Sequence, residues 1–183
     1  MGKTLLYLTG FMGSGKSTIG PIVANTLGWQ FIDLDREIEE RVETSVSKIF
    51  ETKGENYFRE IESKVLLEVS QKEDAVISLG GGTIINEPNL KTVKESGILI
   101  YLKLSPESAY KRLKFKKDRP IFSNIESVSL SKRDFLNKIT SLMAMRTKYY
   151  EQADAIIDTD SLSIGSVVDE IVKFFNKKIK NRK

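Results

Sequence analysis

The chain has 183 residues, 40% of them hydrophobic, which is enough for one domain with a sizeable core. It contains neither cysteine nor histidine, which excludes disulfides, thiolate metal sites and a Ser-His-Asp hydrolase, and leaves acid–base chemistry to carboxylates, lysines or tyrosines. The formal net charge is +4, but without the basic residues of the C-terminal end the chain is nearly neutral, so the charge is poor evidence for nucleic-acid binding; those residues are Lys177, Lys178, Lys180, Arg182 and Lys183.

The first predicted strand, residues 4–9, leads directly into the run GFMGSGKS at residues 10–17, a complete phosphate-loop motif, and a helix is predicted over residues 17–27. The glycines allow backbone angles that other residues resist, so successive N–H groups can point at one anion beside the positive end of the helix. A glycine-rich turn that merely contains a lysine is the alternative, but the flanking strand and helix favour a nucleoside triphosphate site. The predicted ATP-binding residues of this loop are Gly13, Ser14, Gly15, Lys16, Ser17 and Thr18.

Two residues of the loop have side chains suited to phosphoryl transfer. Lys16 supplies a positive charge for the β- and γ-phosphates, and Ser17 supplies a hydroxyl for Mg²⁺. The apolar stretch before the loop breaks at Gly10, which is too early for a membrane span, and it does not have the form of a signal peptide. We therefore expect a cytoplasmic protein with no membrane partner.

Short apolar runs alternate with amphipathic segments along the rest of the chain. Further strands are predicted at residues 30–33, 75–79, 98–103 and 155–158, and further helices at 35–43, 46–52, 57–71, 88–94, 107–113, 132–152 and 163–178. This alternation predicts an α/β fold of three layers, with a five-stranded parallel sheet flanked by helices and right-handed crossovers. Ligands of such sheets bind beyond the carboxyl ends of the strands.

One long segment departs from the alternation. Residues 114–130 show no periodicity and contain Arg119-Pro120. A loop of this length in a compact domain is usually a lid or disordered. We expect a single domain over residues 1–183, with a mobile lid at about 113–131 and a helical, substrate-binding segment at about 34–62.

A pair of carboxylates, Asp33 and Asp35, follows the second predicted strand. If the segment is extended, the two side chains point the same way. One can then hold a metal-bound water while the other accepts a hydroxyl proton; the alternative is that one of them only caps the next helix. The strand at 75–79 lacks the terminal aspartate of an ordinary Walker B motif, so Asp33 is the natural partner of Ser17 at Mg²⁺.

Three glycines and two arginines complete the candidate site. Gly80, Gly81 and Gly82 end a core strand and suit either close backbone approach to a ligand or a flexible turn. Arg59 and Arg146 would be surface charges by default, but a planar guanidinium also suits a carboxylate.

Taken together, these motifs resemble the shikimate kinase family, over nearly the whole chain. The matching motifs are Gly-Ser-Gly-Lys-Ser-Thr at 13–18, Asp-x-Asp at 33 and 35, Phe-Arg-x-x-Glu at 58–62, the triple glycine at 80–82, Arg-Pro at 119 and Arg-x-x-x-Tyr at 146–150. The resemblance implies a P-loop kinase with a fold related to the nucleoside monophosphate kinases. It also implies transfer of the γ-phosphoryl of ATP to the 3-hydroxyl of shikimate.

The resemblance further implies roles for matching residues. Asp35 would contact the ring hydroxyls and accept the proton, Asp33 would hold Mg²⁺ through water, and Glu62 would orient Arg59. The catalytic residues would be Asp35, Lys16 and Arg119, the last on the lid. Arg112 would lie against adenine, opposite the turn after Asp158. The residues in contact with shikimate would be Asp35, Arg59, Gly80, Gly81, Gly82 and Arg146. The chain differs from common family members in having Ile121 after Pro120, a longer stretch between Arg119 and Arg146, and no basic residue at 159–162.

The sequence leaves three other functions open. Another small-metabolite or nucleotide kinase of the same fold is the main alternative, although two aspartates would repel a nucleotide phosphate. A non-catalytic ATP-binding relative and a nucleic-acid-binding ATPase are the others, and the latter rests only on the basic C-terminal end. The expected partners are ATP and shikimate, with Mg²⁺ as cofactor, no nucleic acid, and a monomeric state.

Overall fold

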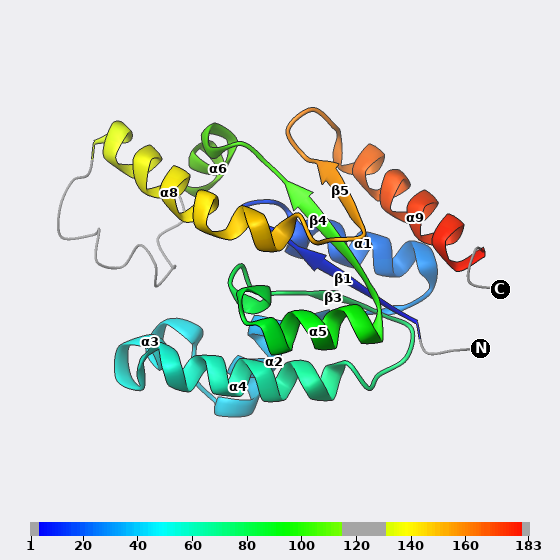
Figure 1. Ribbon diagram of the computed structural model, residues 1–183, viewed down its shortest axis with the longest axis horizontal. Helices are drawn as coiled ribbons and strands as arrows, with labels where there is room; N and C mark the ends of the chain where they lie inside the picture. Colours follow the sequence, from blue (N-terminus) through cyan, green and yellow to red (C-terminus); the bar gives the residue numbers. More distant parts are fainter. Residues whose placement is uncertain (1–3, 115–130, 181–183) are drawn as a thin grey trace.

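The computed structural model describes residues 4–114 and 131–180. Within them a five-stranded parallel sheet has the order β2-β3-β1-β4-β5, and Figure 1 shows helices on both of its faces. The strands are β1 (Leu5–Thr9), β2 (Gln30–Asp33), β3 (Ala75–Ser78), β4 (Ile98–Lys103) and β5 (Ala155–Asp158). All five strands lie where the sequence predicts them, to within a residue at either end.

Most helices fall close to their predicted ranges, and several start at a local capping residue; α4, which has no side-chain cap, starts at Gly54, three residues before its predicted start. Ser45, Asn86, Ser105 and Ser131 each accept a backbone N–H at a helix start. The helical elements are α1 (Lys16–Leu27), α2 (Leu34–Val42), α3 (Val46–Thr52), α4 (Gly54–Val69), η1 (Thr83–Ile85), α5 (Glu87–Ser96), α6 (Pro106–Leu113), α8 (Lys132–Tyr150) and α9 (Ile164–Lys180). Among the residues described, no helix is long and apolar enough to cross a membrane.

Two apolar cores lie on opposite faces of the sheet, and the alternation of side chains along β1 feeds both. Leu6 and Leu8 pack in the core covered by α1 and α9, while Leu5 and Tyr7 pack in the core covered by α4, α5 and α8. All four side chains are fully buried. The central strands are apolar except for their last residues, Thr9, Ser78 and Lys103, as expected of a parallel sheet covered on both sides.

The strand order decides which loops meet at the carboxyl edge. β1 lies between β3 and β4, and β3 lies between β1 and β2. In register, Leu8 and Asp33 both pair with Ser78 on β3. The phosphate loop after β1, the glycines after β3 and the aspartate that ends β2 are therefore neighbours in space.

The expectation that Asp33 and Asp35 share an extended segment is wrong. β2 ends at Asp33, and Asp35 is already in the first turn of α2. Asp33 is the N-cap: its Oδ1 accepts the backbone N–H of Asp35 at 3.2 Å. The helix starts earlier than predicted because this cap is local and strong, so the two side chains follow helical and not strand geometry.

Candidate active site

The phosphate loop has the backbone geometry that its glycines predict. Gly10, Gly13 and Gly15 have φ values of 146°, 82° and 98°, all in the region that favours glycine. At Gly10 space is also limiting, because a Cβ would lie 2.5 Å from the carbonyl oxygen of Leu102. The loop thus needs glycine for its conformation, and it delivers the chain directly into the N-terminus of α1.

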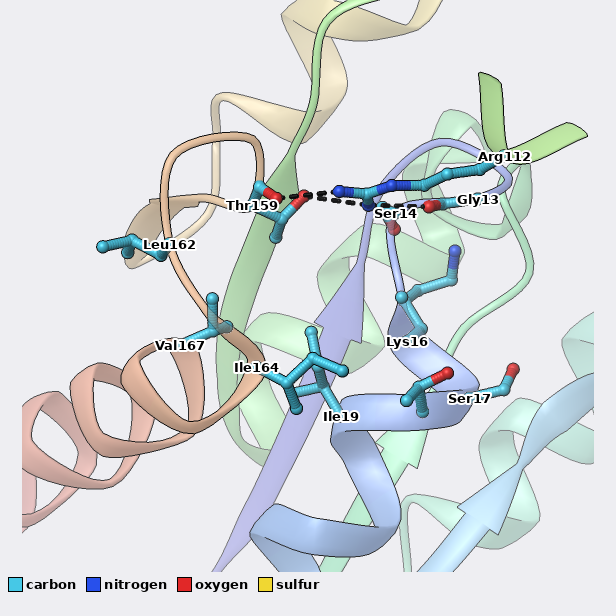
Figure 2. A pocket seen from close by; sticks show the side chains of 12 residues that line it. Gly13, Ser14, Lys16, Ser17, Ile19, Arg112, Thr159, Leu162, Ile164 and Val167 are labelled. Carbon is cyan, nitrogen blue, oxygen red and sulfur yellow. Dashed lines mark hydrogen bonds between the residues drawn. The ribbon is translucent and has the colours of Figure 1, made fainter. Parts of the chain in front are cut away.

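Lys16 and Ser17, the first residues of α1, lie at the mouth of the loop (Figure 2). Lys16 Nζ donates to the carbonyl oxygens of Gly10 at 2.9 Å and Phe11 at 3.3 Å. Ser17 Oγ donates to Asp33 Oδ2 at 3.0 Å. One carboxylate oxygen of Asp33 thus caps α2, and the other accepts the hydroxyl of Ser17, the other residue predicted at Mg²⁺.

The donors at this point fit a magnesium ion bound mainly through nucleotide and water. One hydroxyl and one carboxylate are available, and within residues 4–114 and 131–180 no group of three or more acidic side chains forms a cation cage. Mg²⁺ in nucleotide sites typically takes one or two carboxylates and completes its shell with phosphate oxygens and water. The Ser17 hydroxyl and the Asp33 carboxylate therefore suit a magnesium ion whose other ligands are phosphate oxygens and water.

A cavity of about 390 Å³ extends from the phosphate loop toward α9 (Figure 2). Arg112 crosses it: Nη1 donates to the carbonyl oxygen of Gly13 at 3.0 Å and Nη2 donates to that of Thr159 at 2.8 Å. Arg112 therefore contacts both the phosphate loop and the turn after Asp158. That it lies against adenine, opposite this turn, stays a prediction. Sequence reasoning missed the apolar wall, which consists of Ile19, Leu162, Ile164 and Val167.

The turn after β5 is anchored at two points. Thr159 Oγ1 donates to the carbonyl oxygen of Lys103 at 2.9 Å, and Asp160 Oδ2 accepts the backbone N–H of Ser105 at 2.7 Å. Burial acts to raise the pKa of the Asp160 carboxyl, but hydrogen bonds from Ser105 and Ser108 and the charge of Arg112 together outweigh it, and the pKa is lowered. Asp160 thus holds the turn against the start of α6.

A second, smaller cavity of about 90 Å³ also adjoins the phosphate loop, because Met12 of the loop forms part of its wall. It brings together every residue predicted to contact the acceptor, although these come from α2, α4, the turn after β3, and α8. Those residues are Asp35, Arg59, Gly80, Gly81, Gly82 and Arg146; Val46, Phe50, Phe58 and Glu62 complete the lining.

Arg59 is held by two glutamates of its own helix. Nη1 donates to Glu62 Oε2 at 2.8 Å, while Nε and Nη2 donate to Glu55 Oε1 at 3.2 and 3.1 Å. Burial acts to lower the pKa of Arg59, but Glu62 and then Glu55 outweigh it and the pKa is raised. The guanidinium is therefore firmly charged at the cavity wall.

Arg146 approaches from α8 and is almost fully buried. Its Nη1 donates to the carbonyl oxygen of Gly81 at 3.2 Å, and the hydroxyl of Tyr150, one turn later on α8, donates to the same oxygen. Burial raises the pKa of Tyr150, against the opposing effect of Arg146. The Arg-x-x-x-Tyr motif thus converges on one carbonyl of the glycine turn; its helical spacing was the only sequence signal for Tyr150.

The triple glycine is needed for space and not for an unusual conformation, since none of the three has a positive φ. A Cβ at Gly82 would lie 2.6 Å from Arg59 Nη2, and one at Gly80 would lie 3.0 Å from Asp35 Oδ1. The turn is therefore closely packed by the side chains of the cavity. Neither a flexible surface turn nor conformational freedom explains these glycines.

Two predicted residues need separate comment. Arg119 lies outside the described residues, as do residues 115–130 of the lid expected at about 113–131. Ser14 is fully buried within the phosphate loop, and its Oγ has no hydrogen-bond partner among the residues that the structure describes. Its backbone N–H donates to the carbonyl oxygen of Phe11 at 3.1 Å, closing the loop.

A phosphate loop at the carboxyl edge of a parallel sheet, with an arginine- and aspartate-lined cavity beside it, defines a P-loop kinase of a small molecule. The shikimate kinase family model matches residues 12–176. The chain is 42% identical over 177 residues to the shikimate kinase of Chlorobaculum parvum, covering 97% of this chain and 95% of that protein. The chain belongs to the shikimate kinase family.

Other relatives agree with this assignment. The shikimate kinase of Chlorobium limicola is 44% identical over 170 residues, covering 93% of this chain and 85% of that protein. The solved structure of shikimate kinase from Acinetobacter baumannii in complex with shikimate has a TM-score of 0.87 and 31% identity, over 97% of this chain and 95% of that one. The protein is thus an ATP-dependent kinase whose relatives match it in sequence and in fold.

Proposed function

We propose that this chain transfers the γ-phosphoryl group of ATP to the 3-hydroxyl of shikimate, giving shikimate 3-phosphate and ADP. The observation that carries the proposal is the cavity in which Asp35, Arg59 and Arg146 meet beside the phosphate loop. Two guanidinium groups suit a carboxylate, and an aspartate next to them suits hydroxyls better than a second phosphate.

The nucleotide occupies the larger cavity. Backbone N–H groups of residues 13–18 and the N-terminus of α1 face the phosphates, and Lys16 turns from its loop carbonyls to the β- and γ-phosphates. Arg112 and the apolar wall of Ile19 and Ile164 enclose the base. Ser17 and Asp33 would hold a magnesium ion, which would supply positive charge to neutralise the phosphates.

Shikimate occupies the smaller cavity, with its carboxylate between Arg59 and Arg146. Asp35 contacts the ring hydroxyls and accepts the proton of the 3-hydroxyl as that oxygen bonds to the γ-phosphorus. The bond from this phosphorus to the β–γ bridging oxygen breaks, and ADP leaves with that electron pair. Catalysis is then mainly positioning and charge neutralisation, with Arg119 contributing from a lid at about 113–131.

Two features of the enzyme as a whole belong to the same proposal. The chain acts as one domain, in which α2, α3 and the start of α4, at about residues 34–62, form the substrate-binding segment. It works as a cytoplasmic monomer on two small molecules.

The experiment is a coupled ADP-release assay with ATP, Mg²⁺ and one acceptor at a time: shikimate, gluconate, AMP or CMP. Of the four acceptors, only shikimate is expected to give turnover. Asp35→Asn is expected to bind ATP normally by calorimetry and to lose most of its kcat, because the amide cannot accept the proton. Turnover with another acceptor but not with shikimate would refute the proposal.

A further inference from the structure

Glu62 is a fully buried carboxylate whose two oxygens have different partners. Oε2 accepts a hydrogen bond from Arg59 at 2.8 Å, and Oε1 accepts one from the hydroxyl of Thr83 at 2.7 Å. A buried charge is tolerated only when its lone pairs are satisfied. Arg59 supplies the donor for Oε2, and Thr83 supplies the donor for Oε1.

Glu62 is also the partner that decides where the Arg59 guanidinium lies. The other partner, Glu55, has a side chain that is 63% exposed, whereas that of Glu62 is 0% exposed. Exposed ion pairs on a helix surface are weak and adapt to solvent, while a buried, hydrogen-bonded pair is directional. The orientation of Arg59 toward the cavity is therefore set from the Glu62 side.

Thr83 is itself held firmly in place. It begins η1 directly after the triple glycine and is fully buried. Its N–H donates to the carbonyl oxygen of Gly80 at 3.2 Å, and its own carbonyl accepts Nδ2 of the buried Asn89 on α5 at 3.1 Å. A β-branched side chain on a fixed backbone has few rotamers, so its hydroxyl is a stationary donor.

We propose that Thr83 is a positioning residue for the acceptor site: its hydroxyl fixes Glu62, which in turn fixes Arg59 for the carboxylate of the substrate. The contacts run from Asn89 through Thr83 and Glu62 to Arg59. This inference rests on the proposed function, because it concerns the affinity of the same cavity for shikimate. Nothing in the chain of contacts touches the nucleotide cavity, so the effect is confined to one substrate.

The test compares Thr83→Val, which keeps the shape and removes the hydroxyl, with Thr83→Ser, which keeps the hydroxyl. In Thr83→Val the KM and the calorimetric Kd for shikimate are expected to rise roughly tenfold, because Oε1 of Glu62 loses its buried donor. The kcat is expected to change less than about threefold, and the KM for ATP is expected to match that of wild type. Thr83→Ser is expected to restore most of the shikimate affinity.

The outcomes separate this inference from the proposed function. A wild-type enzyme without shikimate turnover would refute the function itself. A wild-type enzyme that phosphorylates shikimate, with a Thr83→Val variant of unchanged shikimate affinity, would overturn the role of Thr83 alone. Equal losses of affinity for ATP and shikimate would also overturn it, as a general distortion. If the valine variant does not fold, Thr83→Ala serves instead, because alanine also lacks the hydroxyl and is too small to clash; the same rise in the KM for shikimate is expected.

Discussion

Arg41 and Arg59 each form an ion pair with a glutamate, but we expect only Arg59 to matter for substrate binding. Arg41 on α2 pairs with Glu68 on α4, and both side chains are about half exposed, at 45% and 57%. Arg59 pairs with a glutamate that is fully buried and lines a cavity. Exposed pairs contribute little to stability, whereas a buried, directional charge defines a binding site.

The first prediction concerns Arg59, which with Arg146 is proposed to bind the carboxylate of the substrate. Arg59→Ala is expected to lower kcat/KM for shikimate, because the carboxylate of the substrate loses a charged partner. The loss corresponds to ~2–4 kcal/mol of transition-state stabilisation. The KM for ATP should change little. The measurement is steady-state kinetics of ADP release, with thermal denaturation to verify folding, since Glu62 also loses its partner.

Arg41→Ala is the matched control. It removes a guanidinium of the same size from an ion pair on the surface, and kinetic constants and stability are expected to stay within about 0.5 kcal/mol of wild type. Equal effects of the two substitutions on shikimate kinetics would contradict the assignment of Arg59 to the acceptor site.

At the scale of elements, the position of α1 is set by its contact with the sheet. Gly20 on α1 faces Phe31 of β2, and a Cβ there would lie 2.3 Å from the ring. The helix also tolerates Pro21 in its interior. Because the phosphate loop leads directly into α1, the close approach of this helix to the sheet also fixes the loop.

Gly20→Ala is therefore expected to destabilise the fold. Alanine has the higher helix propensity, but the clash with Phe31 should cost ~1–3 kcal/mol and decide the sign. The measurement is the free energy of unfolding in urea.

Gly165→Ala on α9 is the control for this prediction. A Cβ there meets only Ser163 Oγ, at 3.9 Å, so the same exchange in a helix is expected to be neutral or to stabilise by up to ~1 kcal/mol. A Gly20→Ala variant as stable as Gly165→Ala would show that α1 can move away from β2 without loss.

At the scale of the whole molecule, two buried tyrosines of the central sheet connect stability to pH. Burial raises the pKa of Tyr7 on β1 to about 12, against the opposing effect of its hydrogen bond to Ser96. Burial, together with Tyr150 and Glu151, raises the pKa of Tyr101 on β4 to about 12. An unfolded tyrosine has a pKa of about 10.

The sign of the pH dependence follows from these values. Below about pH 10 both tyrosines are neutral in either state, and their contribution is fully present. Between about pH 10 and 12 the unfolded chain releases protons that the folded chain retains, so stability falls by up to ~2–3 kcal/mol for each tyrosine. Urea unfolding at several alkaline pH values measures this slope.

The double variant Tyr7→Phe, Tyr101→Phe is expected to lose the part of the slope that these two rings contribute, because neither ring can ionise, while Tyr150, whose pKa burial also raises, still contributes. Tyr57→Phe, at a site that is 38% exposed, should keep it and serves as the control. An unchanged slope in the double variant would assign alkaline unfolding to other groups.

The sequence indicated the elements well and their mutual arrangement only in part. The apolar runs and the capping serines are local signals, and the strands and helices lie close to where these signals place them. The start of α2 was misjudged because the Asp33 cap competes with strand extension over a single residue. The reason for Gly82 was also missed, because its nearest neighbour, Arg59, is distant in sequence.

By itself, the sequence determined that this chain folds as an alternating α/β protein with a phosphate loop, because both properties depend on residues adjacent along the chain. Only the tertiary structure decided the order β2-β3-β1-β4-β5, the apolar wall that α9 gives to the nucleotide cavity and the contacts from Asn89 to Arg59. These depend on packing between distant segments, whose free energy is a sum over many contacts that no local pattern encodes.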